Sequence, residues 1–283
     1  MKITKAVITA AGRNQRSLPL QMLIDRDGEQ RSVLSILVNE AIRARVESCC
    51  VVVCPGDEEA FRDAAGEHAD RVRFVTQEAP RGYGHAVYCA REYVGGEPFL
   101  HMIGDHIYIS DAGGSCAEQI VATAEANACA VSGVQPTRET LLPLFGAVGG
   151  QRVKGTDDLF VVDQVIEKPT PTQAEQTLLV PGLRTGHYLC FFGIHVLTHL
   201  VMELLGRRLE GAQGPVALSP VLDELARHER YLALEAAGRR YPLDVRYGLL
   251  TAQVALALSG QDRDEVLSGL CELLAQRQIG AGR

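Results

Sequence analysis

The sequence predicts an α/β protein with a mixed, mostly parallel central sheet, flanking helices and a small antiparallel β extension. Three observations predict this class. Short apolar runs alternate with segments of helical periodicity over the first half of the chain. Glycine and polar residues follow several of these runs directly, as they do at the carboxyl ends of parallel strands. From about Pro136 the runs become β-like and are separated by glycines, which indicates a hairpin.

The composition indicates a globular chain and argues against two classes of partner. The 283 residues are 46% hydrophobic and 22% charged, which suffices for one large α/β core. The net charge is −7, whereas a protein that binds nucleic acid or an acidic membrane needs a positively charged surface. No linker, repeat or low-complexity segment divides the sequence. We therefore expect a single domain over residues 1–283 that binds neither nucleic acid nor membrane.

Strands are expected where short apolar runs end in turn residues. In the first half these runs lie at 6–10, 49–54, 72–76, 99–103 and 129–134. In the second half they lie at 145–148, 159–166, 186–194 and 231–236. Gly149, Gly150 and Gly155 separate the first two runs of the second set, which favours an antiparallel pair there.

Helices are expected where apolar residues recur at a spacing of three and four behind a capping residue. Ser32 is the expected cap of a helix over 33–42, and Ser219 that of a helix to residue 228. Asp57 is the expected cap of a helix to about residue 68, and Asp262 with Glu265 resembles a capping box. Further helices are expected at 86–93, 113–126, 196–205 and 247–258, with a short one from Thr172.

A strand that opens into an anion-binding loop is predicted near the amino end. The run at 6–10 ends in Ala11 and Gly12, and Arg13 and Arg16 follow. Small residues let a ligand approach the backbone, whose N–H groups can bind a phosphate. The loop is neither a dinucleotide fingerprint nor a P-loop, because it lacks the second glycine and the Gly-Lys-Ser or Gly-Lys-Thr sequence. Taken alone, the stretch fits a solvated turn with two arginines better than an anion-binding loop.

Cysteine usage predicts a reducing compartment. The eight cysteines are scattered, and most lie in apolar runs, where a free thiol packs as a small hydrophobe. Their spacing contains no zinc motif and no Cys-x-x-Cys pair. Residues 1–5 lead directly into the first strand without the architecture of a secretion signal. We therefore expect a cytoplasmic protein.

Five short motifs follow one another along nearly the whole chain. They are Ala-Gly-Arg-Asn-Gln-Arg-Ser-Leu-Pro from Ala11, Gln77 with Gly-Tyr-Gly-His-Ala from Gly82, Asp105 after an apolar strand, Val-Ile-Glu-Lys-Pro from Val165, and Gly-His-Tyr from Gly186. In this order they resemble the bacterial UTP–glucose-1-phosphate uridylyltransferases of the sugar-1-phosphate nucleotidyltransferase family. The resemblance implies a Rossmann-like nucleotidyltransferase fold and a homo-oligomer, either a dimer or a tetramer. It also implies magnesium-dependent transfer of UMP from UTP to a sugar 1-phosphate, glucose 1-phosphate first, with release of pyrophosphate.

The resemblance further implies a division of labour between two halves of the domain. The half at about 1–135 would bind the nucleotide, through Ala10, Ala11, Gly12, Arg13, Gln77 and Gly82. The half at about 136–283 would bind the sugar phosphate, through Gly146, Glu167, Lys168 and Gly186. The catalytic residues would be Arg16 on the triphosphate, Asp105 on magnesium, and Lys168 on the phosphates of the sugar substrate. Outside this set, we expect His85 to be structural and His195 and His199 to be packing residues.

One departure from the family pattern concerns the anion loop. The lysine that normally follows Arg-x-x-Pro is absent, and Leu20, Gln21 and Met22 stand in that region. Losing this cation should weaken the stabilisation of pyrophosphate. Arg13, Arg26 or Arg31 could substitute only if the altered loop folds back.

The other departure concerns the second metal ligand. Pro242 stands where the family has an aspartate, so either a local rearrangement brings Asp244 to the metal or the second protein ligand is lost. These two departures favour one alternative to an active uridylyltransferase, a non-catalytic sugar-nucleotide-binding protein. A further alternative is an enzyme that uses dTTP, which the Gln77 and Gly-Tyr-Gly-His segment disfavours.

Overall fold

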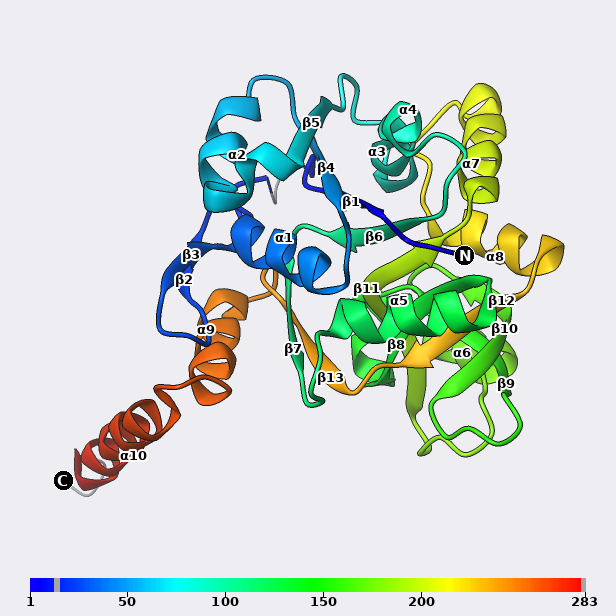
Figure 1. The fold of residues 1–283 in the computed structure, drawn as a ribbon. Helices are drawn as coiled ribbons and strands as arrows, with labels where there is room; N and C mark the ends of the chain where they lie inside the picture. Colours follow the sequence, from blue (N-terminus) through cyan, green and yellow to red (C-terminus); the bar gives the residue numbers. More distant parts are fainter. Residues whose placement is uncertain (13–15, 281–283) are drawn as a thin grey trace.

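The computed structural model describes residues 1–12 and 16–280, the last four by backbone alone. Within these residues the main sheet has nine strands. In chain order they are β1 (Lys5–Thr9), β4 (Ser48–Val53), β5 (Val72–Thr76), β6 (Phe99–Ile103), β8 (Ala130–Arg138), β9 (Ala147–Arg152), β10 (Leu159–Ile166), β11 (His187–Leu197) and β12 (Tyr231–Glu235). Helices cover both faces of this sheet (Figure 1), so the predicted α/β class is confirmed.

The order of strands across the sheet is β5-β4-β1-β6-β11-β8-β12-β10-β9. The first four pair in parallel, and β12 is parallel to β8. Two strands run the other way: β11 lies antiparallel between β6 and β8, and β10 lies antiparallel between β12 and β9. The remaining strands share one direction, so their carboxyl ends meet along one edge. The β9–β10 pair is the antiparallel extension that the glycine spacing predicts.

The helices begin and end as follows. They are α1 (Val33–Arg43), α2 (Glu58–Ala64), α3 (Tyr83–Cys89), α4 (Arg91–Val94), α5 (Cys116–Asn127), α6 (Pro171–Thr177), α7 (His199–Gly211), α8 (Ser219–His228), α9 (Gly248–Leu258) and α10 (Arg263–Gly280). Two 3₁₀ segments, η1 (Gly66–Arg71) and η2 (Glu139–Leu144), complete the helical part.

Neighbouring side chains of the central strands enter two different cores. In β1, Ile8 lies in the core that includes Leu34 of α1 and Ile120 of α5. Val7 lies in the core of the opposite face, with Val87 of α3 among its members. Because both faces are buried, these strands appear in the sequence as continuous apolar runs rather than as alternating patterns.

Helix starts were predicted with mixed success. The Ser32 hydroxyl accepts a hydrogen bond from Ser35 N, as expected for a cap. Asp57 occupies the predicted N-cap position of α2, although its side chain makes no capping bond. The helix ends at Ala64 and is followed by η1, so it is shorter than predicted. Ser219 is not a cap, because it lies inside α8 and Leu218 occupies the cap position.

Two helices were predicted to start too early. The helix expected from residue 113 is α5, which starts at Cys116. The other is the helix expected from residue 196. Val196 and Leu197 belong to β11, where they pair with Leu100 and Phe99 of β6, and α7 starts only at His199. An apolar run that passes from strand to helix has no internal boundary signal, so periodicity alone could not separate the two.

Two small antiparallel sheets were not predicted. They are β2 (Met22–Ile24) with β3 (Gln30–Ser32), and β7 (His106–Ser110) with β13 (Gly238–Pro242). The first is only three residues a side, and the second joins segments far apart in the sequence, so neither gives a local hairpin signal. The β7–β13 pair brings Pro242 opposite His106, at the end of β6.

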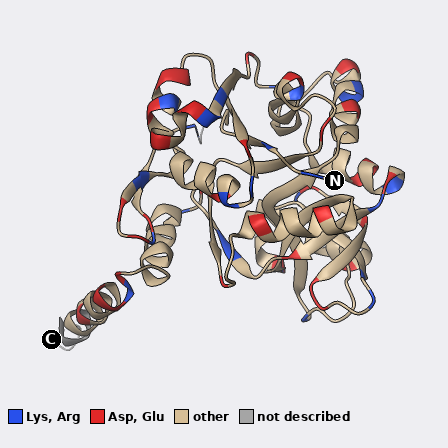
Figure 2. Cartoon of the chain, viewed as in Figure 1, with Lys and Arg blue, Asp and Glu red and all other residues tan. Residues whose placement is uncertain are grey.

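The carboxyl-terminal helix α10 extends away from the body of the molecule (Figure 1). Leu267, Leu273 and Leu274 are exposed on it. Figure 2 shows acidic and basic residues interspersed over the helices. None of the helices in the described part of the chain is both long and apolar enough to cross a membrane.

Candidate active site

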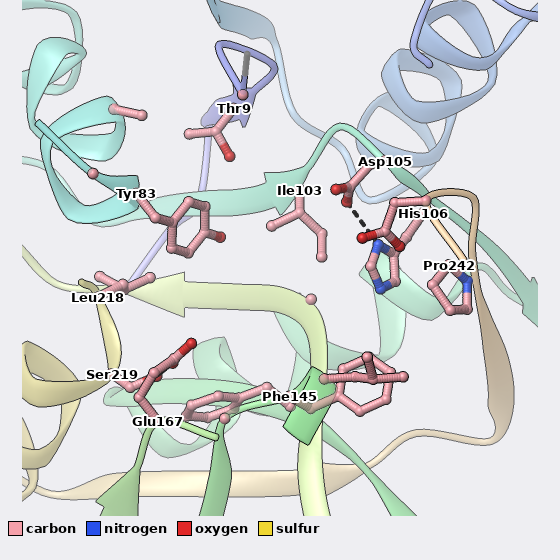
Figure 3. A pocket seen from close by; sticks show the side chains of 18 of the residues that line it. Thr9, Tyr83, Ile103, Asp105, His106, Phe145, Glu167, Leu218, Ser219 and Pro242 are labelled. Carbon is pink, nitrogen blue, oxygen red and sulfur yellow. Dashed lines mark hydrogen bonds and ion pairs between the residues drawn. The ribbon is translucent and has the colours of Figure 1, made fainter. Parts of the chain in front are cut away.

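A cavity of about 580 Å³ opens where β1, β5 and β6 end. Segments distant in sequence close it: the loop before α3, the end of β10, the start of α8 and the turn after β13. Nine of the residues singled out in the sequence line it, namely Ala11, Gly12, Gln77, Gly82, Asp105, Gly146, Glu167, Lys168 and Asp244. Figure 3 shows Asp105 and His106 on one side of the cavity, with Glu167 and Ser219 across from them.

Three other candidates are absent from the described lining, and a fourth lies outside the described residues. Ala10 is buried behind the loop, with its N–H bonded to Val52 O (2.8 Å). Gly186 precedes β11, whose contribution to the cavity comes from Phe191, Gly193 and His195. Arg16 is half exposed and is described below. Arg13 is the candidate that the structure does not describe.

Close packing of two strand ends forms the cavity wall beside Asp105. Gly104 N donates to Thr9 O (2.9 Å), and a Cβ on Gly104 would lie only 2.8 Å from that oxygen. Glycine is therefore required if β6 is to end against β1. The next residue, Asp105, turns into the cavity at the edge where α/β sheets bind ligands (Figure 3).

Asp105 is held beside the segment that contains Asp244. His106 Nδ1 lies 2.8 Å from Asp105 Oδ1, and Leu243 N donates to the Asp105 carbonyl (2.8 Å). Pro242 and Asp244, on either side of Leu243, both line the cavity. The residue at the family's metal position is a proline that cannot bind a cation, while a carboxylate two residues later faces the same space. Metal binding by Asp244 stays a prediction.

The opposite wall carries Glu167 and Lys168 at the end of β10. Lys168 has a left-handed backbone (φ 46°), which is uncommon for a residue with a side chain and is a kind of strain that concentrates at ligand sites. The Ser219 hydroxyl donates a hydrogen bond to Glu167 Oε2. A Cβ on Gly146 would lie 2.7 Å from Ser219 Oγ and 2.9 Å from Phe191 Cδ2, so only glycine fits there.

Gln77 lies at the end of β5 and is only 7% exposed. Its N–H donates to Val53 O (2.9 Å), and its Nε2 donates to Gly82 O (3.0 Å) and contacts His85 Nδ1 (3.0 Å). Gly82 has φ 94°, and a Cβ there would lie 2.6 Å from Val216 O. Gly82 thus allows the loop before α3 to pack directly against the segment before α8.

Two buried histidines lie side by side in the sheet, and one of them lines the cavity. His101 of β6 and His195 of β11 are register partners, with ring centroids 5.7 Å apart. His195 lines the cavity, and its Nδ1 lies 2.6 Å from Ser132 Oγ. Burial lowers the pKa of His195 to about 3 and lowers the pKa of His101 well below its usual value, so both rings are neutral at pH 7.

Basic side chains are scarce around this cavity. Lys168 is the one lysine or arginine among its described lining residues. Arg16 forms an ion pair with Asp57, Nη1 to Oδ2 3.7 Å, beside the loop. Arg31 is bound by Asp25 (3.3 Å) and Asp27 (2.6 Å), and Arg26 lies at a separate hollow under α9, so neither of these two replaces the missing lysine.

Several lining residues were not predicted as site residues from the sequence. Ser219, Phe145, Tyr83 and His106 contribute side chains to the cavity. Tyr83 lies within one of the five motifs, and His106 directly follows Asp105. Both could therefore have been predicted as site residues from their neighbours in the sequence. Ser219 gave no such signal, because it reaches Glu167 across 52 positions of sequence.

The fold and the cavity define an α/β protein that binds its ligand at the carboxyl ends of the strands. The nucleotidyl transferase family matches residues 5–234, which is most of the chain. The chain therefore belongs to the nucleotidyl transferase family.

The relatives found by sequence agree with the resemblance predicted from the motifs. The UTP–glucose-1-phosphate uridylyltransferase of Streptococcus pneumoniae is 26% identical over 96% of this chain and 96% of its own length. That of Bacillus subtilis is 24% identical over 98% and 99%.

Solved structures with the same fold include a UDP-glucose pyrophosphorylase complexed with UDP-glucose. It has a TM-score of 0.73 and 20% identity, and the match covers 89% of this chain and 98% of the other. A UTP-bound enzyme from Acinetobacter baumannii has the same score and identity, with 96% and 99% covered. The predicted nucleotidyltransferase fold is thereby confirmed.

Proposed function

We propose that this protein transfers UMP from UTP to glucose 1-phosphate, giving UDP-glucose and pyrophosphate. The observation that carries the proposal is the composition of one cavity. Gly12, Gln77, Asp105, Glu167 and Lys168 all line it. We assign Gly12 and Gln77 to the nucleotide and Glu167 and Lys168 to the sugar phosphate. The relatives match almost the entire chain, and their names support the same reaction.

The reaction needs no protein nucleophile. A phosphate oxygen of the sugar phosphate attacks the α-phosphorus of UTP, the bond from that phosphorus to the oxygen bridging to the β-phosphate breaks, and pyrophosphate leaves. The protein must align two polyanions and offset their charge. The absence of a Ser-His or Cys-His pair among the residues assigned to the site is consistent with this chemistry.

We assign the uracil to the nucleotide side of the cavity and the hexose to the opposite side. Ala10, Ala11, Gly12, Gln77 and Gly82 would frame the base, with Arg13 and Arg16 toward the triphosphate. Glu167 would accept hydrogen bonds from sugar hydroxyls, and Lys168 would contact the sugar phosphate. Gly146 and Gly186 would permit close approach of the backbone, although only Gly146 is in the described lining.

A magnesium ion would be held by Asp105 and Asp244. Carboxylate oxygens are the donors that magnesium prefers, and both residues line the same cavity. Among the described residues no cluster of three or more His, Cys, Asp or Glu could hold a metal. Two carboxylates fit this ion, because magnesium commonly takes one or two protein ligands and completes its shell with phosphates and water. When bound, it neutralises phosphate charge.

We further propose a single domain with halves at about 1–135 and 136–283, acting as a homo-oligomer in the cytoplasm. The two halves share one sheet through β11. The eight cysteines are all free, which is typical of a reducing compartment. The exposed leucines of α10 offer apolar surface for a second copy. Light scattering on the purified protein would measure the mass, and a monomer would contradict the oligomer.

A non-catalytic sugar-nucleotide-binding protein is the second candidate. The observation that favours it is the shortage of cations, because Lys168 alone among the described lining residues is basic and Arg16 is paired with Asp57. Such a protein would bind the uracil and the sugar but stabilise the departing pyrophosphate poorly.

Pyrophosphate release with a panel of sugar 1-phosphates in magnesium distinguishes the candidates. We expect release with UTP and glucose 1-phosphate and slower release with dTTP. No turnover with any pair, together with a melting temperature that UTP or UDP-glucose still raises, would establish the binding protein instead.

A further inference from the structure

We propose that His195 is a binding residue that donates a hydrogen bond from Nε2 to a hydroxyl of the sugar, and that Ser132 is the positioning residue that keeps its ring in the donating form. The inference rests on the proposed function, because it takes the sugar to lie beside Glu167. It adds a donor to the sugar hydroxyls, whose assigned contact, the Glu167 carboxylate, can only accept.

The carboxyl halves of three neighbouring strands bring a buried chain of hydrogen bonds to the cavity. Ser132 of β8 lies between His195 of β11 and Tyr231 of β12, and all three side chains are buried. Ser132 Oγ lies 2.6 Å from His195 Nδ1 and is also hydrogen-bonded to the Tyr231 hydroxyl. Within the described residues, Ser132 Oγ is the hydrogen-bond partner of that hydroxyl and Tyr231 has no second one.

One arrangement of the protons gives every donor in this chain an acceptor. The Tyr231 hydroxyl donates to Ser132 Oγ, and the Ser132 hydroxyl donates to His195 Nδ1, which can accept only when it carries no proton. In the reverse arrangement, Nδ1–H donates to Ser132 and Ser132 donates to Tyr231. The Tyr231 proton is then buried without an acceptor, which is costly.

The proton of the His195 ring is therefore on Nε2. Burial lowers the pKa of this histidine to about 3, so the ring is neutral at pH 7 and has a single N–H group. Because Nδ1 accepts from Ser132, that group is Nε2–H. The chain of hydroxyls thus makes His195 an uncharged donor with a fixed direction.

The Nε2 atom of His195 is reached from the cavity. It has no hydrogen-bond partner in the described part of the chain, yet the buried side-chain atoms that lack a partner there are Asp57 Oδ2 and His101 Nδ1. His195 Nε2 is therefore not buried. The residue is 3% exposed and lines the cavity, so the exposed surface belongs to the cavity wall. A molecule in the cavity can accept a hydrogen bond from it.

The neighbours of His195 connect this donor to the residues that we assign to the sugar. The rings of His195 and Phe191 have centroids 5.0 Å apart. Phe191 and Ser219 both lie against Gly146, where a Cβ would meet Phe191 Cδ2 at 2.9 Å and Ser219 Oγ at 2.7 Å. Ser219 is bonded to Glu167. A sugar beside Glu167 would therefore adjoin the wall that contains His195, and an uncharged donor suits a neutral hydroxyl.

Two substitutions separate donation from packing. Phe is a ring without a donor, whereas the amide nitrogen of Gln can occupy the site of Nε2 and still donate. We expect His195→Phe to weaken the binding of UDP-glucose about tenfold and to leave the binding of UDP unchanged, because one hydrogen bond to the sugar is lost. We expect His195→Gln to bind both ligands within about threefold of the wild type. Titration calorimetry with each ligand would measure these constants.

Equal weakening of UDP and UDP-glucose in His195→Phe would overturn the proposal in favour of a packing role. Binding measurements keep the test independent of turnover. If the wild type binds UDP-glucose more tightly than UDP, His195→Phe loses that preference and no pyrophosphate is released in the transfer assay, the proposed function fails and the inference stands. Equal binding of UDP and UDP-glucose by the wild type would overturn the inference, whether or not the protein catalyses the transfer.

Analogues of UDP-glucose that each lack one sugar hydroxyl identify the acceptor. For one analogue we expect binding to the wild type to be about tenfold weaker than that of UDP-glucose, with no such loss in His195→Phe, because the variant has already lost the bond. If every analogue loses as much affinity in His195→Phe as in the wild type, the donor does not meet a sugar hydroxyl and the proposal is wrong.

NMR spectroscopy tests the proton position and also covers the case in which His195→Phe does not fold. In the ¹⁵N spectrum of a neutral imidazole, the protonated and unprotonated nitrogens are well separated. We expect wild-type His195 to carry its proton on Nε2, with its signals assigned by their loss in His195→Gln, and a proton on Nδ1 would overturn the proposal. In Ser132→Ala we expect both tautomers, and an unchanged spectrum would remove the positioning role of Ser132.

Discussion

The Ser219 hydroxyl donates a hydrogen bond to the Glu167 carboxylate in the wall of the cavity. The two residues come from different elements, the start of α8 and the end of β10, so the bond fixes the carboxylate relative to a second wall. A carboxylate held in this way keeps one direction in which to accept from a sugar hydroxyl.

Ser219→Ala should therefore raise the KM for glucose 1-phosphate about tenfold, because a hydrogen bond to a charged group is lost. The KM for UTP should change little. Steady-state kinetics with each substrate varied in turn would measure both values. Ser268→Ala, on the exposed surface of α10, is the matched control. Equal effects on the two substrates would argue against an ordered Glu167.

Asp105→Ala should lower kcat by about 100-fold or more, because a ligand of the proposed metal is removed. The melting temperature should fall by only a few degrees, about 1 kcal/mol of stability, since a carboxylate at a strand end contributes little packing. Turnover assays and thermal unfolding test the two parts. Asp111→Ala, which removes a carboxylate from the exposed surface, is the control. Full activity in the variant would remove Asp105 from the mechanism.

Lys168→Ala should raise the KM for sugar phosphate by about tenfold or more and affect UTP much less. The reason is that Lys168 supplies positive charge on the sugar side, and no other described lining residue is a lysine or arginine. Lys154→Ala removes an exposed lysine from the turn between β9 and β10 and should be silent. An unchanged response to sugar phosphate would count against the assigned role.

Gly146→Ala should impair sugar binding, because the new Cβ would meet Ser219 Oγ at 2.7 Å and Phe191 at 2.9 Å. One of these side chains must move, and both line the cavity. We expect a rise in KM for glucose 1-phosphate of about tenfold with a loss of stability of about 1–3 kcal/mol. Gly214→Ala, where a Cβ meets nothing within 4 Å, provides the comparison. Wild-type kinetics in Gly146→Ala would show that Ser219 and Phe191 can move aside without weakening the binding of sugar phosphate.

The histidine pair predicts acid sensitivity. The pKa values of His101 and His195 are lowered in the folded state, so the unfolded chain binds more protons than the folded one. The protein should therefore lose stability as the pH falls below about 6.5, the value of an unperturbed histidine. At pH 5 each histidine should account for about 2 kcal/mol of the loss relative to pH 7.5.

His101→Leu should remove about half of that pH-dependent loss. The substitution suits the site, because His101 Nδ1 is buried and, in the described structure, has no hydrogen-bond partner. Urea unfolding at pH 7.5 and 5.0 would measure the difference for the variant and the wild type. The same pH dependence in both proteins would place the acid sensitivity elsewhere.

Local signals allowed most of the main sheet to be predicted. The strand ends near Ala11, Gln77 and Asp105 were identified because a buried strand is an apolar run that stops abruptly at small or polar residues. Such a boundary depends on a few adjacent residues. The order of the strands then brings those three ends together without further information.

Longer-range relationships could not be predicted. Arg16 was expected to bind triphosphate, but its partner in the structure, Asp57, lies 41 positions away and was itself assigned to a helix cap. Gly186 matched a motif, yet it is absent from the described lining of the cavity. The first residue of β11 in that lining is Phe191, which lies five residues further along the chain, or about 17 Å at about 3.3 Å per residue. Its role in binding sugar phosphate remains a prediction.

The eleven residues of β11 are hydrogen-bonded to β6, to β8 and to β9. A strand shared in this way joins the two proposed halves of the domain by backbone hydrogen bonds in the described part of the chain. We therefore expect any change of shape on substrate binding to occur in the loops at the edge of the cavity, such as those that carry Gly12, Gly82 and Lys168. We expect the sheet beneath them to keep its shape.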